Sequence, residues 1–391
     1  MKGKILLCVT GGIAAYKAID LASQLTKSGF EVKIALTKNA QRFVSALSFS
    51  AIINQGVHTD LFENSDPIPH IHLADWADLT IVAPATANII AKAAQGIGDD
   101  LVSTILLSQP KPVLFVPAMN VHIYEHPATQ NNLKILKERG NYILEPETGL
   151  LACGYEGKGK YPPNEEVIYA IRCYLKYPAN LTGKKILVTA GATAEPIDPM
   201  RMITNKSSGK MGLSIARAFA LRGAEVTLVY GIVTETIPYY MKNSIFAPTA
   251  KLMYDAVMKQ AKNYDIIVQC AAVSDYKPIK ASTQKIKKSK NFNLELIATP
   301  DILEQLGKNK FPKQKLIGFA AESEHILENA KEKLQKKNLD LICANNLETA
   351  GKDETTLNLI RAGATKTTKP IQLTGNKFDV ALDLVEYIIS L

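Results

Sequence analysis

Short apolar runs alternate with longer amphipathic stretches along most of the chain. The first run, Ile5–Thr10, ends at Gly11 and Gly12, and Ile13–Ser28 then has the spacing of a helix that Gly29 closes. Fully apolar strands that alternate with helices are typical of a parallel sheet with both faces covered. Further strands are predicted at Glu31–Thr37, Leu79–Ala83 and Val113–Val116, and further helices at Ala87–Gln95 and Asp100–Ser108.

The same pattern begins again in the second half, after a segment that contains Pro178, Asn180 and Gly183. Two such beginnings predict an α/β chain of two Rossmann-like, doubly wound domains, residues 1–180 and 181–391. In the second domain, strands are predicted at Lys185–Ala190, Glu225–Tyr230, Asp265–Ala271, Lys315–Ala320 and Asp340–Ala344. One helix is predicted to run through Arg222, and others at Thr249–Lys262, Ser323–Lys337 and Phe378–Leu391.

The amino-acid composition is that of a globular protein. Of the 391 residues, 47% are hydrophobic and 21% are charged, which disfavours collagenous, disordered and membrane-spanning classes. No apolar run reaches the ~18 residues that a spanning helix needs, and glycines interrupt the start before a signal-peptide core could form. Five cysteines without a C-x-x-C pair indicate neither a disulfide framework nor a zinc site. We therefore expect a cytoplasmic protein with no membrane partner.

The formal net charge of +9 is unevenly distributed. Residues 1–180 contain 16 Lys and Arg against 16 Asp and Glu, whereas residues 181–391 contain 30 against 21. An excess confined to one half favours a local anionic partner, such as a nucleoside triphosphate or a nucleic acid, over a uniformly basic surface.

Clusters of small polar residues follow the predicted strands of the first domain: Thr10-Gly11-Gly12, Thr37-Lys38-Asn39, Pro84–Asn88 and Pro117–Asn120. Each cluster alone is compatible with an ordinary turn. Open parallel sheets bind ligands beyond the carboxyl ends of their strands, so four clusters at one edge indicate one crevice. No G-x-G-x-x-G follows Thr10, and a mononucleotide such as a flavin therefore fits better than a dinucleotide.

Two single residues of the first domain are further candidates. His70 could act as a base near neutral pH or as a metal ligand, although a lone histidine is usually a surface residue or one with its hydrogen bonds satisfied. Cys153 lies in a glycine-rich segment, where Lys158 and Lys160 could lower the pKa of its thiol. Other cysteines lie in predicted strands and are expected in the core: Cys8, Cys270 and Cys343.

The second domain has a long insertion, Ala192–Ser208, between its first strand and helix, where α/β folds place ligands. Ser207–Lys210 could offer backbone donors, hydroxyls and a cation to a phosphate, or form an ordinary helix cap. Asp275 could bind a magnesium ion or a ribose hydroxyl, or form a turn. Lysines 285, 287 and 288 could neutralise a triphosphate or form a solvated loop.

The motifs TGGIAAYK, HIHLADWADL, APATAN, PAMN and LACG, in this order, resemble the flavin-dependent decarboxylases that act on cysteine-derived carboxylates. The resemblance implies a flavoprotein decarboxylase fold with FMN as cofactor and catalytic roles for His70, Asn120 and Cys153. The chain departs from the family after PAMN, where Ile123-Tyr124 replaces the common methionine and aromatic residue. The implied FMN-binding residues are Gly11, Gly12, Ile13, Thr37, Thr86, Ala87, Asn88 and Ala118.

Thr189–Gly212 (TAGATAEPIDPMRMITNKSSGKMG), Ala271–Tyr276 and Lys285–Lys288 resemble phosphopantothenate–cysteine ligase domains. The two resemblances cover nearly the whole chain, which is similar to the bifunctional phosphopantothenoylcysteine decarboxylase/phosphopantothenate–cysteine ligases of bacterial coenzyme A synthesis. The implied CTP-binding residues are Asp275, Lys285, Thr299, Pro300, Asp301, Ile302, Phe319, Lys333 and Lys337. Asp275 is also the implied Mg2+ ligand. Lys285 is implied to be catalytic, and Asn205 and Arg201 to handle the acyl-cytidylate and the substrate carboxylate.

The resemblance implies two consecutive reactions with 4′-phosphopantothenate, L-cysteine and CTP as substrates. CTP activates phosphopantothenate as an acyl-cytidylate, cysteine's amine forms an amide, and FMN-dependent decarboxylation then gives 4′-phosphopantetheine. The implied assembly is a homo-oligomer based on trimers of the first domain and dimers of the second, with a dodecamer among the candidates.

Two other functions compete with this interpretation. A nucleic-acid-binding protein would explain the basic half, but one Trp, 7% aromatic residues and no recognised binding motif disfavour it. The other is a flavoprotein decarboxylase fused to an inactive nucleotide-binding domain. We accordingly expect no nucleic-acid partner.

Overall fold

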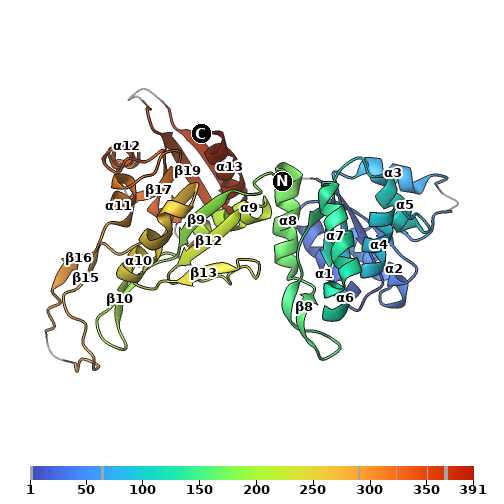
Figure 1. Ribbon diagram of the computed structural model, residues 1–391, viewed down its shortest axis with the longest axis horizontal. Helices are drawn as coiled ribbons and strands as arrows, with labels where there is room; N and C mark the ends of the chain where they lie inside the picture. Colours follow the sequence, from blue (N-terminus) through green and yellow to red (C-terminus); the bar gives the residue numbers. More distant parts are fainter. Residues whose placement is uncertain (1–2, 63–65, 289–290, 323, 350, 365–368) are drawn as a thin grey trace. The chain divides into compact units, whose positions relative to one another are not determined.

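The computed structural model describes the chain except residues 1–2, 63–65, 289–290, 323, 350 and 365–368 (Figure 1). The chain divides into two compact units, Met1–Pro178 and Ala179–Leu391. Each unit is built on its own sheet.

The first unit contains a six-stranded sheet in the order β3-β2-β1-β4-β5-β6, whose neighbouring strands are all parallel. The strand order reverses between β1 and β4, and such a switch point is where open sheets bind ligands. The strands are β1 (Lys4–Val9), β2 (Glu31–Leu36), β3 (Val57–His58), β4 (Leu79–Ala85), β5 (Val113–Pro117) and β6 (Tyr142–Ile143), with a separate antiparallel hairpin of β7 (Glu147–Leu150) and β8 (Glu156–Lys160).

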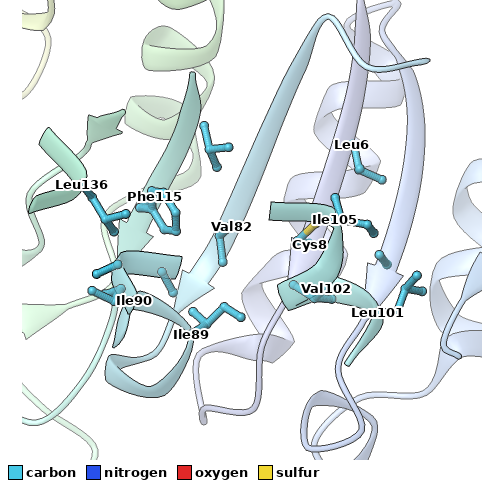
Figure 2. Close-up of a cluster of buried hydrophobic side chains, with 14 of the residues drawn as sticks. Leu6, Cys8, Val82, Ile89, Ile90, Leu101, Val102, Ile105, Phe115 and Leu136 are labelled. Carbon is cyan, nitrogen blue, oxygen red and sulfur yellow. The ribbon is translucent and has the colours of Figure 1, made fainter. Parts of the chain in front are cut away.

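The helices of this unit cover both faces of the sheet. They are α1 (Ala15–Lys27), α2 (Ala46–Ile53), α3 (Pro69–Trp76), α4 (Ala87–Gln95), α5 (Leu101–Ser108), α6 (Val121–Glu125), α7 (Pro127–Glu138) and α8 (Asn164–Lys176). Figure 2 shows one core, in which Val82 and Phe115 of the sheet pack with Ile89 of α4, Ile105 of α5 and Leu136 of α7. α1 and α8 contact each other and β4 outside this cluster, so they cover the other face.

The second unit contains an eight-stranded sheet in the order β13-β12-β9-β14-β17-β18-β19-β20. Its strands are parallel up to β18, and β19 and β20 then add an antiparallel hairpin at the edge. The strands are β9 (Lys185–Ala190), β12 (Glu225–Tyr230), β13 (Asn243–Phe246), β14 (Ile266–Gln269), β17 (Lys315–Glu322), β18 (Leu341–Asn346), β19 (Glu354–Arg361) and β20 (Ile371–Asn376).

Three helices, α10 (Ala250–Gln260), α11 (Ile302–Lys308) and α12 (Ile326–Lys336), share a core with one face of this sheet. α9 (Lys210–Leu221) and α13 (Lys377–Ser390) pack against each other outside that cluster. Two small antiparallel pairs complete the unit: β10 (Ala194–Pro196) with β11 (Met202–Thr204), and β15 (Tyr276–Pro278) with β16 (Leu296–Ala298).

The predicted fold class, two doubly wound α/β domains, is confirmed, but three details were wrong. The second sheet is mixed, because the hairpin of β19 and β20 was not predicted. The helix expected from Ser323 begins at Ile326, and Ser323 lies outside the described residues. The strand expected to reach Ala271 ends at Gln269, so Cys270 is only partly buried, whereas Cys8 and Cys343 are buried as predicted.

Candidate functional site

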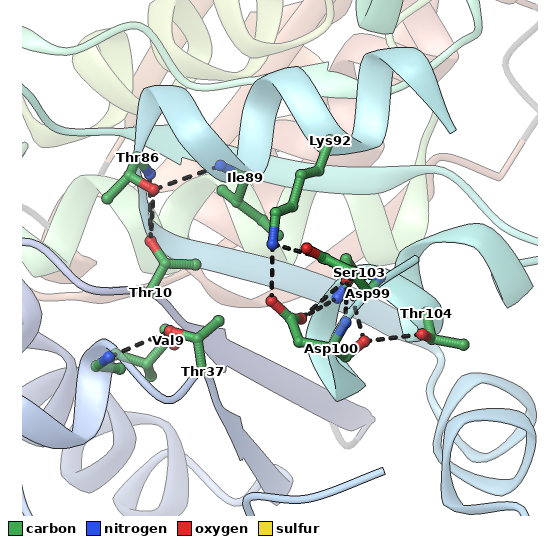
Figure 3. Close-up of polar contacts among 11 residues, drawn as sticks. Val9, Thr10, Thr37, Thr86, Ile89, Lys92, Asp99, Asp100, Ser103 and Thr104 are labelled. Atoms are coloured by element: carbon green, nitrogen blue, oxygen red, sulfur yellow. Dashed lines mark hydrogen bonds and ion pairs between the residues drawn. The ribbon is translucent and has the colours of Figure 1, made fainter. Parts of the chain in front are cut away.

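The turns after β1 and β4 are joined at the switch point of the first sheet. Thr10 Oγ1 donates to Pro84 O at 2.6 Å and accepts from the backbone N–H of Thr86 at 3.2 Å. Figure 3 shows Thr10 facing Thr86, whose own hydroxyl accepts from Ile89 N–H and caps α4. The start of α4 is therefore fixed beside the turn that leads into α1.

The turns after β2 and β5 join the same edge. The N–H of Thr37 donates to Val9 O, and the N–H of Ala118 donates to Ala85 O, both at 3.1 Å. All residues expected to bind FMN lie on these four turns: Gly11, Gly12 and Ile13 after β1, Thr37 after β2, Thr86, Ala87 and Asn88 at the start of α4, and Ala118 after β5.

The turn after β1 packs closely against the turns that follow β2 and β4. A Cβ atom on Gly11 would lie 2.4 Å from Asn39 Cβ, and one on Gly12 would lie 3.4 Å from Thr86 Cγ2, so Gly11 has no room for a side chain. The N-cap of α1, Ala14, supplies no capping side chain. Helix N–H groups without such a cap can bind a phosphate, and the exposed side chain of Ile13 can pack on a ring system. This chemistry fits FMN.

His70 occupies the first turn of α3, after Pro69. Its Nδ1 is buried and makes no hydrogen bond with any described residue. Nearby His72 differs, because its Nδ1 lies 2.9 Å from Asp66 at the surface. A buried imidazole nitrogen without a partner is costly in isolation, so His70 is the histidine of this pair that is suited to contact a bound molecule.

Cys153 and Asn120 lie in contact although they are far apart in the sequence. Asn120 Nδ2 donates to Cys153 Sγ at 3.0 Å. The backbone N–H of Tyr155 and the Asn120 amide stabilise the thiolate and hold the pKa of Cys153 below its ordinary value. The lysines that we expected to have this effect pair elsewhere: Lys158 with Glu145 at 2.5 Å and Lys160 with Glu147 at 2.9 Å. The expected cause of the thiol's acidity was therefore wrong.

The hairpin of β7 and β8, which presents Cys153 on its turn, is attached to the segment after β5 through glycines. Met119 N–H donates to Gly159 O at 2.9 Å. A Cβ atom on Gly159 would lie 2.2 Å from Met119 O, and one on Gly157 would lie 2.6 Å from Val121 Cγ2. Only glycine permits this approach, and Gly159 also has a φ of 149°.

In the second unit, the segment after β14 is bound to the turn region of β9. Thr189 Oγ1 accepts from the N–H groups of Cys270 at 3.1 Å and Ala271 at 3.0 Å. Asn205 Nδ2 donates to Ala272 O and Val273 O, both at 3.2 Å. Asn205 therefore lies at the switch point between β9 and β14, where a ligand is expected.

Arg201 is bound to a residue that the sequence analysis did not select. Its guanidinium Nη2 lies 2.5 Å from Asp198 Oδ2, and the Asp198 side chain is fully buried. Asp198 also accepts from the N–H of Ile286, next to the exposed Lys285. An Asp-Pro turn with Arg three residues after the Asp was the available signal, because Asp commonly binds the backbone in such turns.

Most of the residues expected to bind CTP form two groups. Thr299 N–H donates to Asp275 O at 2.9 Å, and Lys337 Nζ lies 2.6 Å from Asp301 Oδ2. Burial opposes the charged form of Asp301, but Lys337 and the Glu304 N–H outweigh it and lower the carboxyl pKa. Pro300 and Ile302 adjoin Asp301, which caps α11.

The other group lies between β17 and α12, where Lys333 Nζ donates to Phe319 O at 2.8 Å. Among the residues that the structure describes, no ion pair joins the exposed Lys285 to either group. At the start of α9, Gly209 has a φ of 77° and Lys210 pairs with Asp353 in the segment before β19. Lys210 is therefore neutralised by a carboxylate rather than left as a single cation.

Among the described residues, no cluster of three or more His, Cys, Asp or Glu side chains could hold a metal ion. Mg2+ at Asp275 would accordingly need oxygen ligands from a substrate phosphate, as this ion commonly does. No helix in the described part of the chain has the length and apolar character to cross a membrane.

Two family models match the chain. Residues 1–176 match the flavoprotein family, and residues 181–391 match the DNA/pantothenate metabolism flavoprotein C-terminal domain. The first unit is thus a flavoprotein domain.

Curated relatives match over the full length. The chain is 43% identical to the coenzyme A biosynthesis bifunctional protein CoaBC of Bacillus subtilis, covering 99% of this chain and 97% of that protein. It is 41% identical to the CoaBC protein of Haemophilus influenzae, covering 100% and 98%. A crystal structure of the C-terminal domain of a CoaBC protein is 37% identical, covers 53% of this chain and 95% of that chain, and has a TM-score of 0.45. The chain belongs to the family of coenzyme A biosynthesis bifunctional proteins.

Proposed function

We propose that the second unit uses CTP to join L-cysteine to 4′-phosphopantothenate, and that the first unit decarboxylates the resulting phosphopantothenoylcysteine to 4′-phosphopantetheine. These are two consecutive steps of coenzyme A biosynthesis. Family membership supports the pair of reactions. The contact between Asn120 and Cys153 is the main support for assigning catalytic roles to individual residues. It brings a thiol that could act as an acid next to a carboxamide, beside the turns that we expect to bind FMN.

In the first unit, bound FMN would supply oxidation of the cysteinyl thiol and the later return of a hydride. Asn120 holds the departing carboxylate by neutral hydrogen bonds, which orient the group without the strong ground-state stabilisation of an ion pair. His70 assists the loss of CO2 with an imidazole whose Nδ1 has no hydrogen-bond partner among the described residues. Cys153 protonates the enethiolate product, and its lowered pKa makes the thiol a better acid.

In the second unit, Lys285 neutralises the charge that develops on the leaving pyrophosphate. Asp275 would hold a Mg2+ ion, which would supply further positive charge to the phosphates. Arg201 binds the carboxylate of phosphopantothenate, and Asn205 orients the acyl-cytidylate that cysteine's amine attacks. Thr299, Asp301 and Lys337, with Phe319 and Lys333, bind the nucleotide.

The purified protein tests this proposal directly. It should be yellow and, with phosphopantothenate, cysteine, CTP and Mg2+, should evolve CO2 and form phosphopantetheine. Cys153→Ser should stall after CO2 loss. Lys285→Gln should abolish CO2 evolution unless phosphopantothenoylcysteine is supplied, whereas Lys259→Gln on the exposed face of α10 should behave as wild type. A folded wild-type protein that releases no pyrophosphate with CTP and phosphopantothenate would favour an inactive second unit.

A further inference from the structure

Asp198 lies in the connection between β10 and β11, and both of its carboxylate oxygens are used. Oδ1 accepts from the backbone N–H groups of Met200 at 2.8 Å and Arg201 at 2.9 Å. Oδ2 accepts from Arg201 Nε at 2.9 Å, from Arg201 Nη2 at 2.5 Å and from Ile286 N–H at 3.1 Å. A buried carboxylate is retained at low cost only when it is paired and hydrogen-bonded to this extent.

The two oxygens have different tasks. The bonds to Oδ1 are local and shape the turn that leads to Arg201. The bonds to Oδ2 connect that turn to a segment 88 residues later, which carries Lys285. Arg201 Nη2 strengthens the connection by donating to Ile286 O at 2.8 Å, and Ser282 N–H donates to Ile197 O at 2.9 Å.

The connection fixes the backbone beside one exposed side chain, Lys285, and binds the guanidinium of another, Arg201. The Arg201 side chain is 46% exposed, and Lys285 is exposed beside Ile286, whose N–H donates to Asp198 Oδ2. The Arg201 fork is fixed on its inner side by Oδ2, and its outer side remains accessible to an anion. Groups held in place before the reaction stabilise developing charge without reorganisation.

We propose that Asp198 is a positioning residue of the second unit, which holds the Arg201 guanidinium and the Lys285 segment in one arrangement for acyl activation. The inference rests on the proposed ligase function. Asp198 need not touch a substrate, because it acts through Arg201 and the backbone of Ile286.

Asp198→Asn is the decisive variant, since the Asn carbonyl can keep the two bonds of Oδ1 while its NH2 group replaces Oδ2. Asn cannot accept from Arg201 and Ile286 at that position. We expect kcat for CTP-dependent pyrophosphate release to fall about 10- to 100-fold, with a smaller change in KM for CTP. Asp255→Asn, which removes an exposed Asp that pairs with Lys251, is the matched control and should keep wild-type kinetics.

Hydrogen exchange of the peptide 282–288, measured without substrates, tests the connection independently of activity. It should be faster in Asp198→Asn than in wild type and in Asp255→Asn. If Asp198→Asn does not fold, the same measurement is made on Arg201→Lys. Lysine has no planar guanidinium to bind both Asp198 Oδ2 and Ile286 O, so exchange should be faster in this variant as well. Unchanged exchange in a folded variant would overturn the inference.

A double-mutant cycle separates positioning from general destabilisation. Because Asp198 acts in part through Arg201, the loss in kcat caused by Asp198→Asn should be smaller in an Arg201→Gln background than in wild type. Fully additive losses would overturn the inference. A wild-type protein without CTP-dependent activity would instead overturn the proposed function, and the exchange experiment would still decide whether Asp198 holds the segment.

Discussion

The Cys153 thiol owes its lowered pKa to two hydrogen-bond donors, the Tyr155 N–H and the Asn120 amide. Asn120→Ala removes one of them, so the pKa should rise. At pH 7 the thiolate fraction, and with it the rate of alkylation by iodoacetamide, should fall, by about tenfold for each unit of pKa increase. The pH dependence of alkylation, followed by mass spectrometry, measures the pKa. All five cysteines lie in described positions, and among these Cys153 alone is exposed.

Lys160→Gln provides the control for charge near this thiol. Lys160 pairs with Glu147 and does not contribute to the lowered pKa, so the alkylation profile should match that of wild type. If the pKa of Cys153 rose as much in Lys160→Gln as in Asn120→Ala, the hydrogen-bond explanation would be contradicted.

Sequence reasoning identified residues more readily than it identified their partners. The PAMN and LACG motifs pointed to Asn120 and Cys153, but nothing in a separation of 33 residues predicts a 3.0 Å contact. Asp198 was missed for a similar reason, since its role depends on Ile286, 88 residues away. Local turn chemistry is visible in a sequence, whereas a tertiary hydrogen bond is not.

At the scale of elements, the attachment of the β7–β8 hairpin depends on Gly159. Gly159→Ala would place a Cβ atom 2.2 Å from Met119 O, so the backbone of β8 or of residues 119–121 must move. We expect the contact between Asn120 and Cys153 to be lost and CO2 evolution from phosphopantothenoylcysteine to fall about 10- to 100-fold.

Gly154→Ala is the matched control for this substitution. Gly154 also has positive φ, at 83°, but a Cβ atom there would meet nothing within 4 Å. Only backbone strain of about 1–2 kcal/mol is expected, seen as a lower melting temperature with decarboxylation largely retained. Equal loss of activity in both variants would show that φ, rather than close approach, governs the hairpin.

Strands in the middle of a sheet, which are mostly apolar, were predicted well. Strands at a sheet edge or in a separate hairpin were not predicted. β9 has the predicted bounds because its apolar residues Ile186–Val188 lie just before the turn at Gly191. β19 alternates buried and less buried positions at the edge of the sheet, and β7 and β8 contain glycines chosen for close approach rather than for strand propensity. Neither pattern predicts a strand clearly from the sequence, because the neighbouring strands that would explain it are not known at that stage.

At the scale of the whole molecule, each unit has a sheet and a hydrophobic core of its own. A substitution in one active site should therefore leave the other unit folded. We expect an equal mixture of Lys285→Gln and Cys153→Ser chains to form phosphopantetheine from phosphopantothenate, cysteine and CTP, although neither variant does so alone. Product formation followed by mass spectrometry provides the measurement.

Two separate assays are the controls for the mixture. Cys153→Ser should form phosphopantothenoylcysteine at the wild-type rate, and Lys285→Gln should decarboxylate it. If both hold and the mixture still forms no phosphopantetheine, the intermediate does not pass between active sites of different chains.

The hairpin of β7 and β8 is attached to the rest of the unit at one place and carries Cys153 at another. Its support is the pair of glycine contacts in β8, whereas the sulfur sits on residues 151–155, which lie beyond those contacts. The number of residues in that turn thus sets how far the Cys153 sulfur extends from the attached base of the hairpin. A longer or shorter turn would move the sulfur relative to the sheet and leave the glycine contacts of β8 as they are.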